Sequence, residues 1–202
     1  MTEITIVNYG MGNVGSVRNM FKRIGIKAII TDNLDLIEQA KKLVLPGVGA
    51  FDTAMERINS TALRSILDYK VINQKTPVLG ICLGMQILTN QSEEGRQPGL
   101  GWIEAACYRF PSQDLKVPHM GWNIVQINNP SPLCQNLPEE PRFYFVHSYY
   151  VKTKELKLRS ISDSNLLKGI YQLQSKGISF IHNPYCFESY LLSPNTIQAC
   201  DI

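Results

Sequence analysis

The chain has 202 residues, which is enough for one sizeable hydrophobic core and short for two domains. Hydrophobic residues make up 44% and charged residues 18%, as in ordinary soluble globular proteins. The formal net charge is only +3, and lysines and arginines do not cluster. This charge gives no reason to expect a nucleic-acid partner.

The N-terminus and the cysteines indicate the compartment. Residues 1–7 contain an acid and alternating polar side chains, whereas a signal peptide needs a basic and then a uniformly apolar run. No apolar stretch approaches the ~20 residues that cross a bilayer. The five cysteines are odd in number, scattered and without a CxxC pair, which is typical of reduced thiols rather than of disulfides or a zinc site. We therefore expect a cytoplasmic protein with no membrane partner.

Hydrophobic periodicity predicts alternating strands and helices over the first half of the chain. Short apolar runs predict strands over 4–7, 28–31, 42–45 and 78–81. Helical spacing of apolar residues predicts helices over 16–24, 34–40, 54–69 and 83–89. Strands that are apolar throughout and alternate with helices indicate a parallel sheet covered on both faces.

Beyond about Trp102 the pattern changes to short runs separated by prolines. The runs 123–127 and 143–146 predict hairpins or strands at the edge of the same sheet. We find no linker, repeat or low-complexity segment and expect a single domain over 1–202. The predicted fold class is α/β, with a mostly parallel central sheet flanked by helices and with added antiparallel edge strands.

A glycine-rich turn follows the first predicted strand. Gly10, Gly12 and Gly15 have the GxGxxG spacing of a dinucleotide-binding turn. Asp32 ends the next predicted strand, where such sites place an acid for the ribose. Because a tight turn between strand and helix needs glycine in any case, a plain turn or a loop that faces a partner protein is favoured over a nucleotide site.

A stronger motif lies at the end of the fourth predicted strand. Cys82 stands between an apolar strand and a helix, with Gly80 two residues before it and Gly84 two residues after. This is the spacing of a nucleophile elbow, in which glycines leave room for a strained turn. The helix N-terminus favours the thiolate, and the backbone N–H of Leu83 can bind a developing oxyanion. The alternative is a small buried cysteine at a strand end.

Five motifs stand in order along the chain: Tyr9–Asn13, Leu45–Phe51, Gly80–Gln86, Pro118–Asn123 and Phe145–Tyr149. Together they resemble the class I glutamine amidotransferases, and among these the glutaminase subunits of imidazole glycerol phosphate synthases. The resemblance covers about residues 4–152. At position 8 this chain has Asn8 where the family usually has Asp. The resemblance implies a flavodoxin-like three-layer fold and no metal or other cofactor.

The resemblance also implies roles. Cys82 would attack the side-chain amide of glutamine, form a thioester and release ammonia. The residues that would bind the substrate or its oxyanion are Gly49, Leu83, Gln86, Glu94, Ser148 and Tyr149. Of these, Gln86 and Glu94 would hold the α-amino and carboxylate end of glutamine, unless they are ordinary exposed polar residues.

The resemblance further implies a heterodimer with a barrel-shaped cyclase subunit, which consumes the ammonia to make imidazole glycerol phosphate and an aminoimidazole ribonucleotide (AICAR). The residues implied at this interface are Asn13, His119, Met120, Gly121, Trp122 and Asn123. A turn that faces this partner removes the need for a nucleotide at Gly10. For His119 and His147 the resemblance implies structural hydrogen bonds rather than a catalytic role, and Trp122 could equally be a core residue.

The resemblance stops near residue 152. The family completes its catalytic triad near the C-terminus with Phe-His-Pro-Glu, which this chain lacks. The nearest fragment, 180–188, offers His182 as the base and Glu188 as the residue that orients it. Residues two apart on a strand lie about 7 Å apart on one face, whereas residues six apart lie about 20 Å apart. Glu188 therefore reaches His182 only if Pro184 turns the chain back.

Several interpretations stay open. Three explanations of the tail from 154 to 202 are open. The tail has diverged but still completes the site, the protein is a catalytically silent relative, or a shifted reading frame has replaced the last quarter of the family's sequence. The function is a glutaminase for histidine biosynthesis, or a glutaminase for a surface-polysaccharide sugar amidotransferase, whose branch the run 142–150 also resembles. A non-catalytic docking subunit that has lost its triad and a dinucleotide-dependent enzyme are the remaining alternatives.

Overall fold

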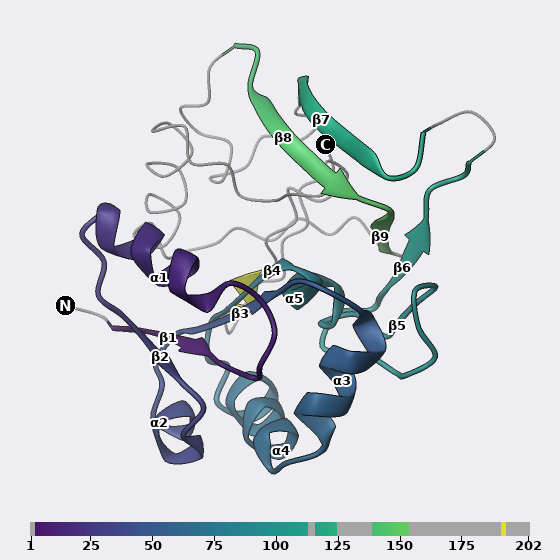
Figure 1. The fold of residues 1–202 in the computed structure, drawn as a ribbon. Coiled ribbons are helices and arrows are strands. Elements are labelled where there is room, and N and C mark those ends of the chain that lie inside the picture. Colours follow the sequence, from purple (N-terminus) through teal and green to yellow (C-terminus); the bar gives the residue numbers. More distant parts are fainter. Residues whose placement is uncertain (1–2, 113–115, 125–138, 154–190, 193–202) are drawn as a thin grey trace.

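The computed structural model describes residues 3–112, 116–124, 139–153 and 191–192 (Figure 1). A central sheet runs in the order β10-β4-β3-β1-β2. Neighbouring strands are parallel except for β10, which lies antiparallel to β4. The strands of this sheet are β1 (Ile4–Val7), β2 (Ala28–Thr31), β3 (Leu43–Gly47), β4 (Val78–Cys82) and β10 (Leu191–Leu192).

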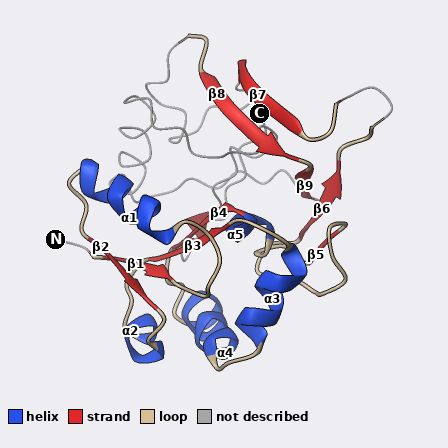
Figure 2. Ribbon diagram, viewed as in Figure 1, coloured by secondary structure: helices blue, strands red, loops and turns tan. Residues whose placement is uncertain are grey.

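Helices cover both faces of this sheet (Figure 2). The helical elements are α1 (Val14–Arg23), α2 (Leu34–Glu38), α3 (Phe51–Asn59), α4 (Leu63–Asp68), α5 (Leu83–Gln86) and the π-helical turn η1 (Tyr69–Asn73). Side chains alternate along each strand, so Leu45 packs into the larger core cluster with residues of α2, α3 and α4. Val44 packs on the other face, with Val17 and Phe21 of α1. This arrangement confirms the predicted α/β class.

The second half of the chain forms two further small sheets. One is β5 (Gln91–Ser92), β6 (Ala105–Arg109) and β9 (Tyr149–Thr153), and the other is the antiparallel pair β7 (His119–Ile124) and β8 (Arg142–His147). The expectation that the strands 123–127 and 143–146 extend the central sheet is therefore wrong. Backbone N–H groups of residues 99–103 donate to carbonyls of residues 87–90, which holds the chain against α5 and starts β6 beside β5.

The predicted strands of the central sheet are confirmed, whereas two helices differ from their predicted ranges. The segment 54–69 is divided between α3 and α4, and the segment 83–89 is helical only as far as Gln86. Helix α1 begins at Val14 because the side chain of Asn13 caps it by accepting the N–H of Ser16 at 3.1 Å. Within the described ranges, no helix has the length and hydrophobicity that a membrane span requires.

Candidate active site

Cys82 ends β4 and precedes the first residue of α5. Its backbone has φ +54° and ψ −118°, a conformation that residues with a side chain rarely adopt. In the parallel register, Cys82 lies opposite Gly47 of β3. These angles confirm the strained strand-to-helix turn that the glycine spacing predicts. Such strain in a non-glycine residue is characteristic of functional sites.

Three glycines let the backbone close up around this turn. A Cβ on Gly80 would lie 2.6 Å from the Cα of Met85, and a Cβ on Gly84 would lie 2.6 Å from the carbonyl carbon of Leu45. On Gly47, a Cβ would lie 2.8 Å from the backbone nitrogen of Gly84. The β3 strand and the elbow therefore meet backbone to backbone, and a side chain at any of the three positions would separate them.

The thiol of Cys82 is subject to opposing influences. Burial is the strongest and raises its pKa, although the residue is still partly accessible. The backbone N–H of Leu83 lowers the pKa, as expected at a helix N-terminus, and the charge of Glu94 raises it. Helix α5 has only four residues and the effect of burial dominates. The pKa of Cys82 is therefore raised overall, whereas the predicted stabilisation of the thiolate would lower it. Nucleophilic attack therefore requires a group that takes the thiol proton.

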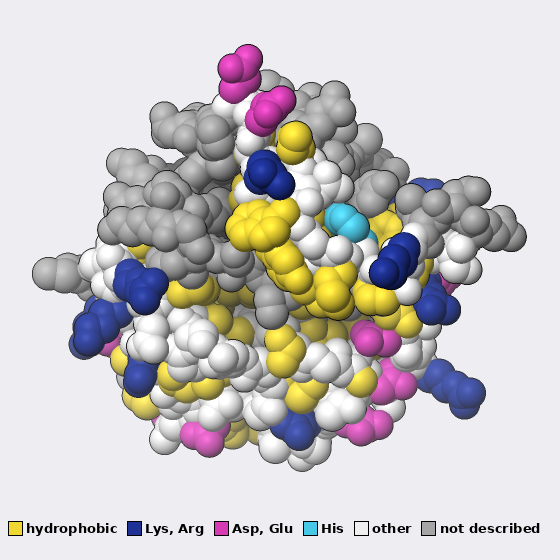
Figure 3. All heavy atoms as spheres, turned by 45° about the horizontal axis from the view of Figure 1, so that its top comes forward, with side chains coloured by type: hydrophobic (Ala, Val, Ile, Leu, Met, Phe, Trp, Pro, Cys, Tyr) yellow, Lys and Arg dark blue, Asp and Glu magenta, His cyan; other side chains and the backbone are white. Residues whose placement is uncertain are grey.

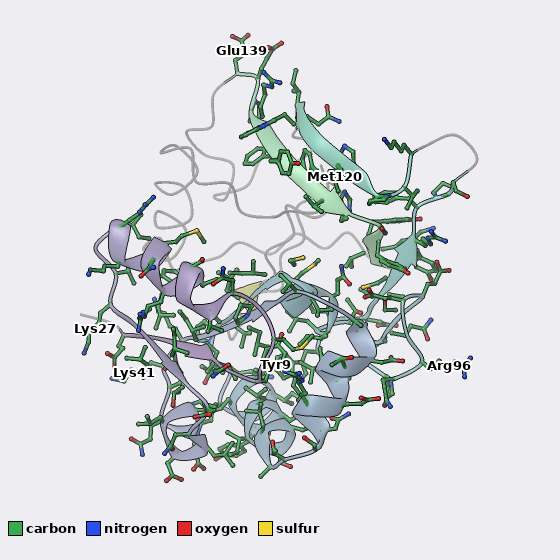
Figure 4. The ribbon with its side chains drawn as sticks, viewed as in Figure 1. Tyr9, Lys27, Lys41, Arg96, Met120 and Glu139 are labelled. Atoms are coloured by element: carbon green, nitrogen blue, oxygen red, sulfur yellow. The ribbon has the colours of Figure 1, made fainter. Side chains whose placement is uncertain are left out.

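Tyr9 supports the strand beside Cys82. This buried residue, labelled in Figure 4, donates its hydroxyl proton to the carbonyl oxygen of Pro46 at 2.5 Å. Burial, and then the charge of Cys82, raise the pKa of Tyr9, so the phenol stays neutral and remains a donor. The sequence places Tyr9 in a motif but gives no sign of this contact, because Pro46 is 37 residues away.

The predicted oxyanion residue Gly49 follows β3 with φ +107°. It is exposed, and the side-chain methyl of Met11 would lie 3.1 Å from a Cβ at that position. Leu83, the second predicted oxyanion residue, directs its N–H to the Cys82 thiol. Gly49 lies two residues beyond Gly47, which pairs with Cys82, so both predicted oxyanion residues adjoin the elbow.

Gln86 and Glu94 are not ordinary exposed side chains. Gln86 is only 6% exposed, and its Oε1 has no hydrogen-bond partner among the described residues. Glu94 is half-buried and accepts the backbone N–H of Phe51. Burial raises the pKa of Glu94, and the neighbouring charge of Asp52 raises it further. A buried amide oxygen without a donor and a half-buried carboxylate can both accept hydrogen bonds from a ligand.

His119 and His147 hydrogen-bond to each other, which fits the structural role expected of both. His147 Nδ1 lies 3.0 Å from the carbonyl oxygen of Tyr149, which only accepts, so Nδ1 carries the proton. His147 Nε2 is then the acceptor for His119 Nδ1, at 3.2 Å. Burial is the main reason that the pKa of His147 is lowered to about 4, and burial also lowers the pKa of His119. Both rings are therefore neutral at physiological pH.

For the remaining predicted substrate and catalytic residues the structure shows fewer contacts with the elbow. Ser148 and Tyr149 lie where β8 meets β9. The carbonyl of Ser148 accepts the N–H of Phe110 at 3.0 Å. His182 and Glu188, predicted as the base and its partner, lie outside the described residues.

The structure explains the glycine-rich turn without a nucleotide. The guanidinium of Arg57 donates to the carbonyl of Gly10, whose φ is +80°. A Cβ on Gly12, with φ +85°, would lie 3.1 Å from the backbone nitrogen of Gly47. The first two glycines are thus required by the turn and by its packing on β3. Asp32, the predicted ribose acid, is exposed.

The β7–β8 ribbon has one apolar exposed face. Met120 is 61% exposed, Trp122 57% and Ile124 53%, and they alternate with residues on the opposite face. Trp122 meets Tyr144 of β8 edge to face, with ring centroids 5.7 Å apart. Figure 3 shows hydrophobic side chains gathered on this side of the molecule, and Figure 4 labels Met120 on the ribbon. The alternative that Trp122 is a core residue is therefore wrong.

Comparison with known proteins is consistent with this site. The family model described as glutamine amidotransferase class-I matches residues 5–180. The chain therefore belongs to the class-I glutamine amidotransferases. Within that class it is similar to subunit HisH 2 of imidazole glycerol phosphate synthase from Methanococcus maripaludis, with 54% identity over 76% of this chain and 77% of the relative. The HisH 2 subunit from Pseudomonas aeruginosa is 49% identical over 75% of this chain and 76% of its own.

Solved structures share the fold. A crystal structure of a glutamine amidotransferase superposes with a TM-score of 0.59 at 17% identity and covers 85% of this chain and 98% of its own. A glutamine amidotransferase from Thermotoga maritima superposes with a TM-score of 0.52 at 16% identity, over 77% of this chain and 64% of its own. These identities are low, so the likeness concerns the fold alone.

Proposed function

We propose that this chain is the glutaminase subunit of an imidazole glycerol phosphate synthase and works in histidine biosynthesis. The observation that carries the proposal is the strained Cys82 elbow in a member of the class-I glutamine amidotransferases. The relatives named as HisH subunits of imidazole glycerol phosphate synthase support the pathway. The scattered, odd-numbered cysteines support a cytoplasmic location, where thiols stay reduced.

In the proposed reaction, the sulfur of Cys82 attacks the side-chain carbonyl carbon of glutamine as its thiol proton passes to a base. The N–H of Leu83 and the backbone at Gly49 stabilise the oxyanion of the tetrahedral intermediate. Collapse of this intermediate breaks the C–N bond, and the leaving nitrogen takes up a proton and departs as ammonia. Water then hydrolyses the Cys82 thioester and releases glutamate.

The substrate would be held at its amino-acid end. The unpartnered Oε1 of Gln86 and the half-buried carboxylate of Glu94 support this role, because both are acceptors suited to the α-ammonium group. Backbone contacts from Ser148 and Tyr149 would complete the pocket. We assign the proton-accepting role to His182, with Glu188 as its orienting partner, on the sequence fragment 180–188.

The ammonia would pass to a cyclase subunit docked on the apolar face of the β7–β8 ribbon. Exposed aromatic and methionine side chains are typical anchors of protein interfaces. Asn13, at the turn before α1, would add a polar contact at the same interface. His119, Gly121 and Asn123 lie on the opposite face of β7, where they support the ribbon.

Ammonia release tests the chemistry. The purified chain is assayed for ammonia from glutamine, with and without a cyclase partner and its nucleotide ligand, beside Cys82→Ala. We expect release that requires the complex and disappears in Cys82→Ala. A complex that forms but releases no ammonia would instead identify a non-catalytic docking subunit. Loss of release in His182→Ala would establish the base.

Two variants test the docking face. Trp122→Ala is expected to weaken cyclase binding by at least about tenfold, because truncating a buried interface aromatic commonly costs about 2 kcal/mol or more. Tyr69→Ala is the control, since Tyr69 is 49% exposed and lies on η1. Equal affinities of both variants and the unmodified chain would rule out this face.

A second candidate shares the glutaminase and changes the partner. The run 142–150 also resembles glutaminases that serve surface-polysaccharide sugar amidotransferases, and it includes strand β8 of the docking ribbon. Binding assays with both kinds of synthase partner separate the candidates. Activation of ammonia release by the sugar-modifying partner alone would favour the second.

A further inference from the structure

Asp52 makes a group of hydrogen bonds that the proposed chemistry does not use. It is the second residue of α3 and therefore directly follows the segment that carries Gly49. Its carboxylate accepts the backbone N–H of Arg96, at 2.8 Å to Oδ1 and 3.0 Å to Oδ2, and that of Gln97, at 2.9 Å to Oδ1. These bonds hold the turn 93–97 against the N-terminal end of α3, across more than 40 residues of sequence.

The turn fits closely over this carboxylate. A Cβ on Gly95 would lie 2.6 Å from the Cγ of Asp52, so only glycine allows the backbone to approach so near. The N–H of Glu94 donates to the hydroxyl of Ser92 at 3.1 Å. The Glu94 carboxylate accepts the N–H of Phe51, the residue before Asp52. Glu94 is therefore fixed through its own side chain and through the turn on both sides of it.

The contact serves the main chain of the turn rather than its side chains. The guanidinium of Arg96 makes none of these hydrogen bonds and extends into solvent in Figure 4. The backbone N–H bonds are the largest cause of the lowered pKa of Asp52, so this carboxylate is ionised at neutral pH. Ionised acceptors make stronger hydrogen bonds than neutral ones.

We infer that Asp52 is a positioning residue for glutamine binding, because it clamps the turn 93–97 and thereby sets the place of Glu94 beside the Cys82 elbow. This inference rests on the proposed role of Glu94 in holding the amino-acid end of the substrate. Phe51, whose N–H the Glu94 carboxylate accepts, lies four residues after Gly47, which pairs with Cys82 in the parallel register, so the turn is held near the elbow. The charge of Glu94 also raises the pKa of the Cys82 thiol. Both Asp52 oxygens are occupied by backbone N–H groups, so the substrate contact falls to Glu94.

The kinetic test compares Asp52→Ala, Asp52→Asn and Glu94→Gln in complex with the cyclase subunit. Asp52→Ala is expected to raise the KM for glutamine about tenfold, the loss that corresponds to one charge-assisted hydrogen bond. We expect kcat and the alkylation rate of Cys82 by iodoacetamide to change less than about threefold, because the elbow is untouched. Asp52→Asn keeps Oδ1, which accepts two of the three bonds, and is expected to rescue most of the KM.

Asp35→Ala is the matched control, since Asp35 lies in the first turn of α2 and makes none of these bonds. Limited trypsin digestion then reports on the clamp itself. In Asp52→Ala, cleavage after Arg96 should accelerate about tenfold, while cleavage at the other lysines and arginines keeps its rate. Accelerated cleavage at all of these sites would show a general structural defect and overturn the inference. A fall in kcat as large as the rise in KM would do the same.

The outcomes separate this inference from the proposal beneath it. A raised KM in Glu94→Gln with an unchanged KM in Asp52→Ala overturns the positioning role of Asp52 alone. An unchanged KM in Glu94→Gln removes the proposed substrate contact, and the inference falls with it. Absence of ammonia release from the unmodified complex overturns the proposed function.

Discussion

Gly80→Ala tests whether the elbow depends on close backbone packing. A Cβ at this position would lie 2.6 Å from the Cα of Met85, 2.7 Å from the carbonyl oxygen of Gly84 and 2.8 Å from the nitrogen of Met85. Ordinary contact begins at 3.4 Å, so α5 would have to retreat by about 0.8 Å. Overpacking costs about 1–3 kcal/mol, and because backbone rather than a flexible side chain must move, we expect about 3 kcal/mol.

Urea unfolding of the two proteins measures this loss. The control is Gly15→Ala in α1, where the nearest atom to a new Cβ is 3.9 Å away. It is expected to leave the free energy of unfolding unchanged or to raise it by up to about 1 kcal/mol, because alanine is the better helix former. A Gly80→Ala protein within about 0.5 kcal/mol of the unmodified chain would refute the packing argument.

Three further outcomes follow from the site and the ribbon. Tyr9→Phe should lower the free energy of unfolding by about 1–2 kcal/mol, since the buried Pro46 carbonyl loses a donor; an equally stable variant would contradict this. Glu94→Gln should lower the pKa of Cys82 and speed its alkylation by iodoacetamide at pH 8, because a negative charge that disfavours the thiolate is gone; an unchanged rate would count against it. Stability should fall by up to about 3 kcal/mol from pH 7 to pH 4, because the unfolded chain protonates His147 near pH 6.5 and the folded chain only near pH 4. His147→Asn should flatten that part of the pH profile in urea unfolding.

The central sheet could be predicted because its strands are apolar throughout and short. The break between α3 and α4 could not, because apolar residues continue at helical spacing through Ile58, Leu63 and Leu67. Ser60 ends α3 by bonding back to the carbonyls of Glu56 and Arg57, a competition that the hydrophobic pattern does not register.

The strained turn at Cys82 was predictable because its glycines lie within two residues of it. Asp52 and Tyr9 were not, because their partners are 44 and 37 residues away. An acid in the first turn of a helix usually indicates nothing more than a favourable interaction with the helix dipole. Local patterns likewise left open whether Trp122 belongs to the core, and only its exposure in the folded ribbon shows that it faces outward.

The backbone contact between β3 and the elbow limits how this protein can evolve. Gly47, Gly80 and Gly84 offer no side chain whose gradual replacement could adjust the reactivity of Cys82. Adaptive change near Cys82 is therefore directed to the surrounding layer, where Tyr9 and Glu94 act through a hydrogen bond and a charge. Lineages that acquire a new synthase partner would keep the elbow intact and vary in that layer and on the ribbon.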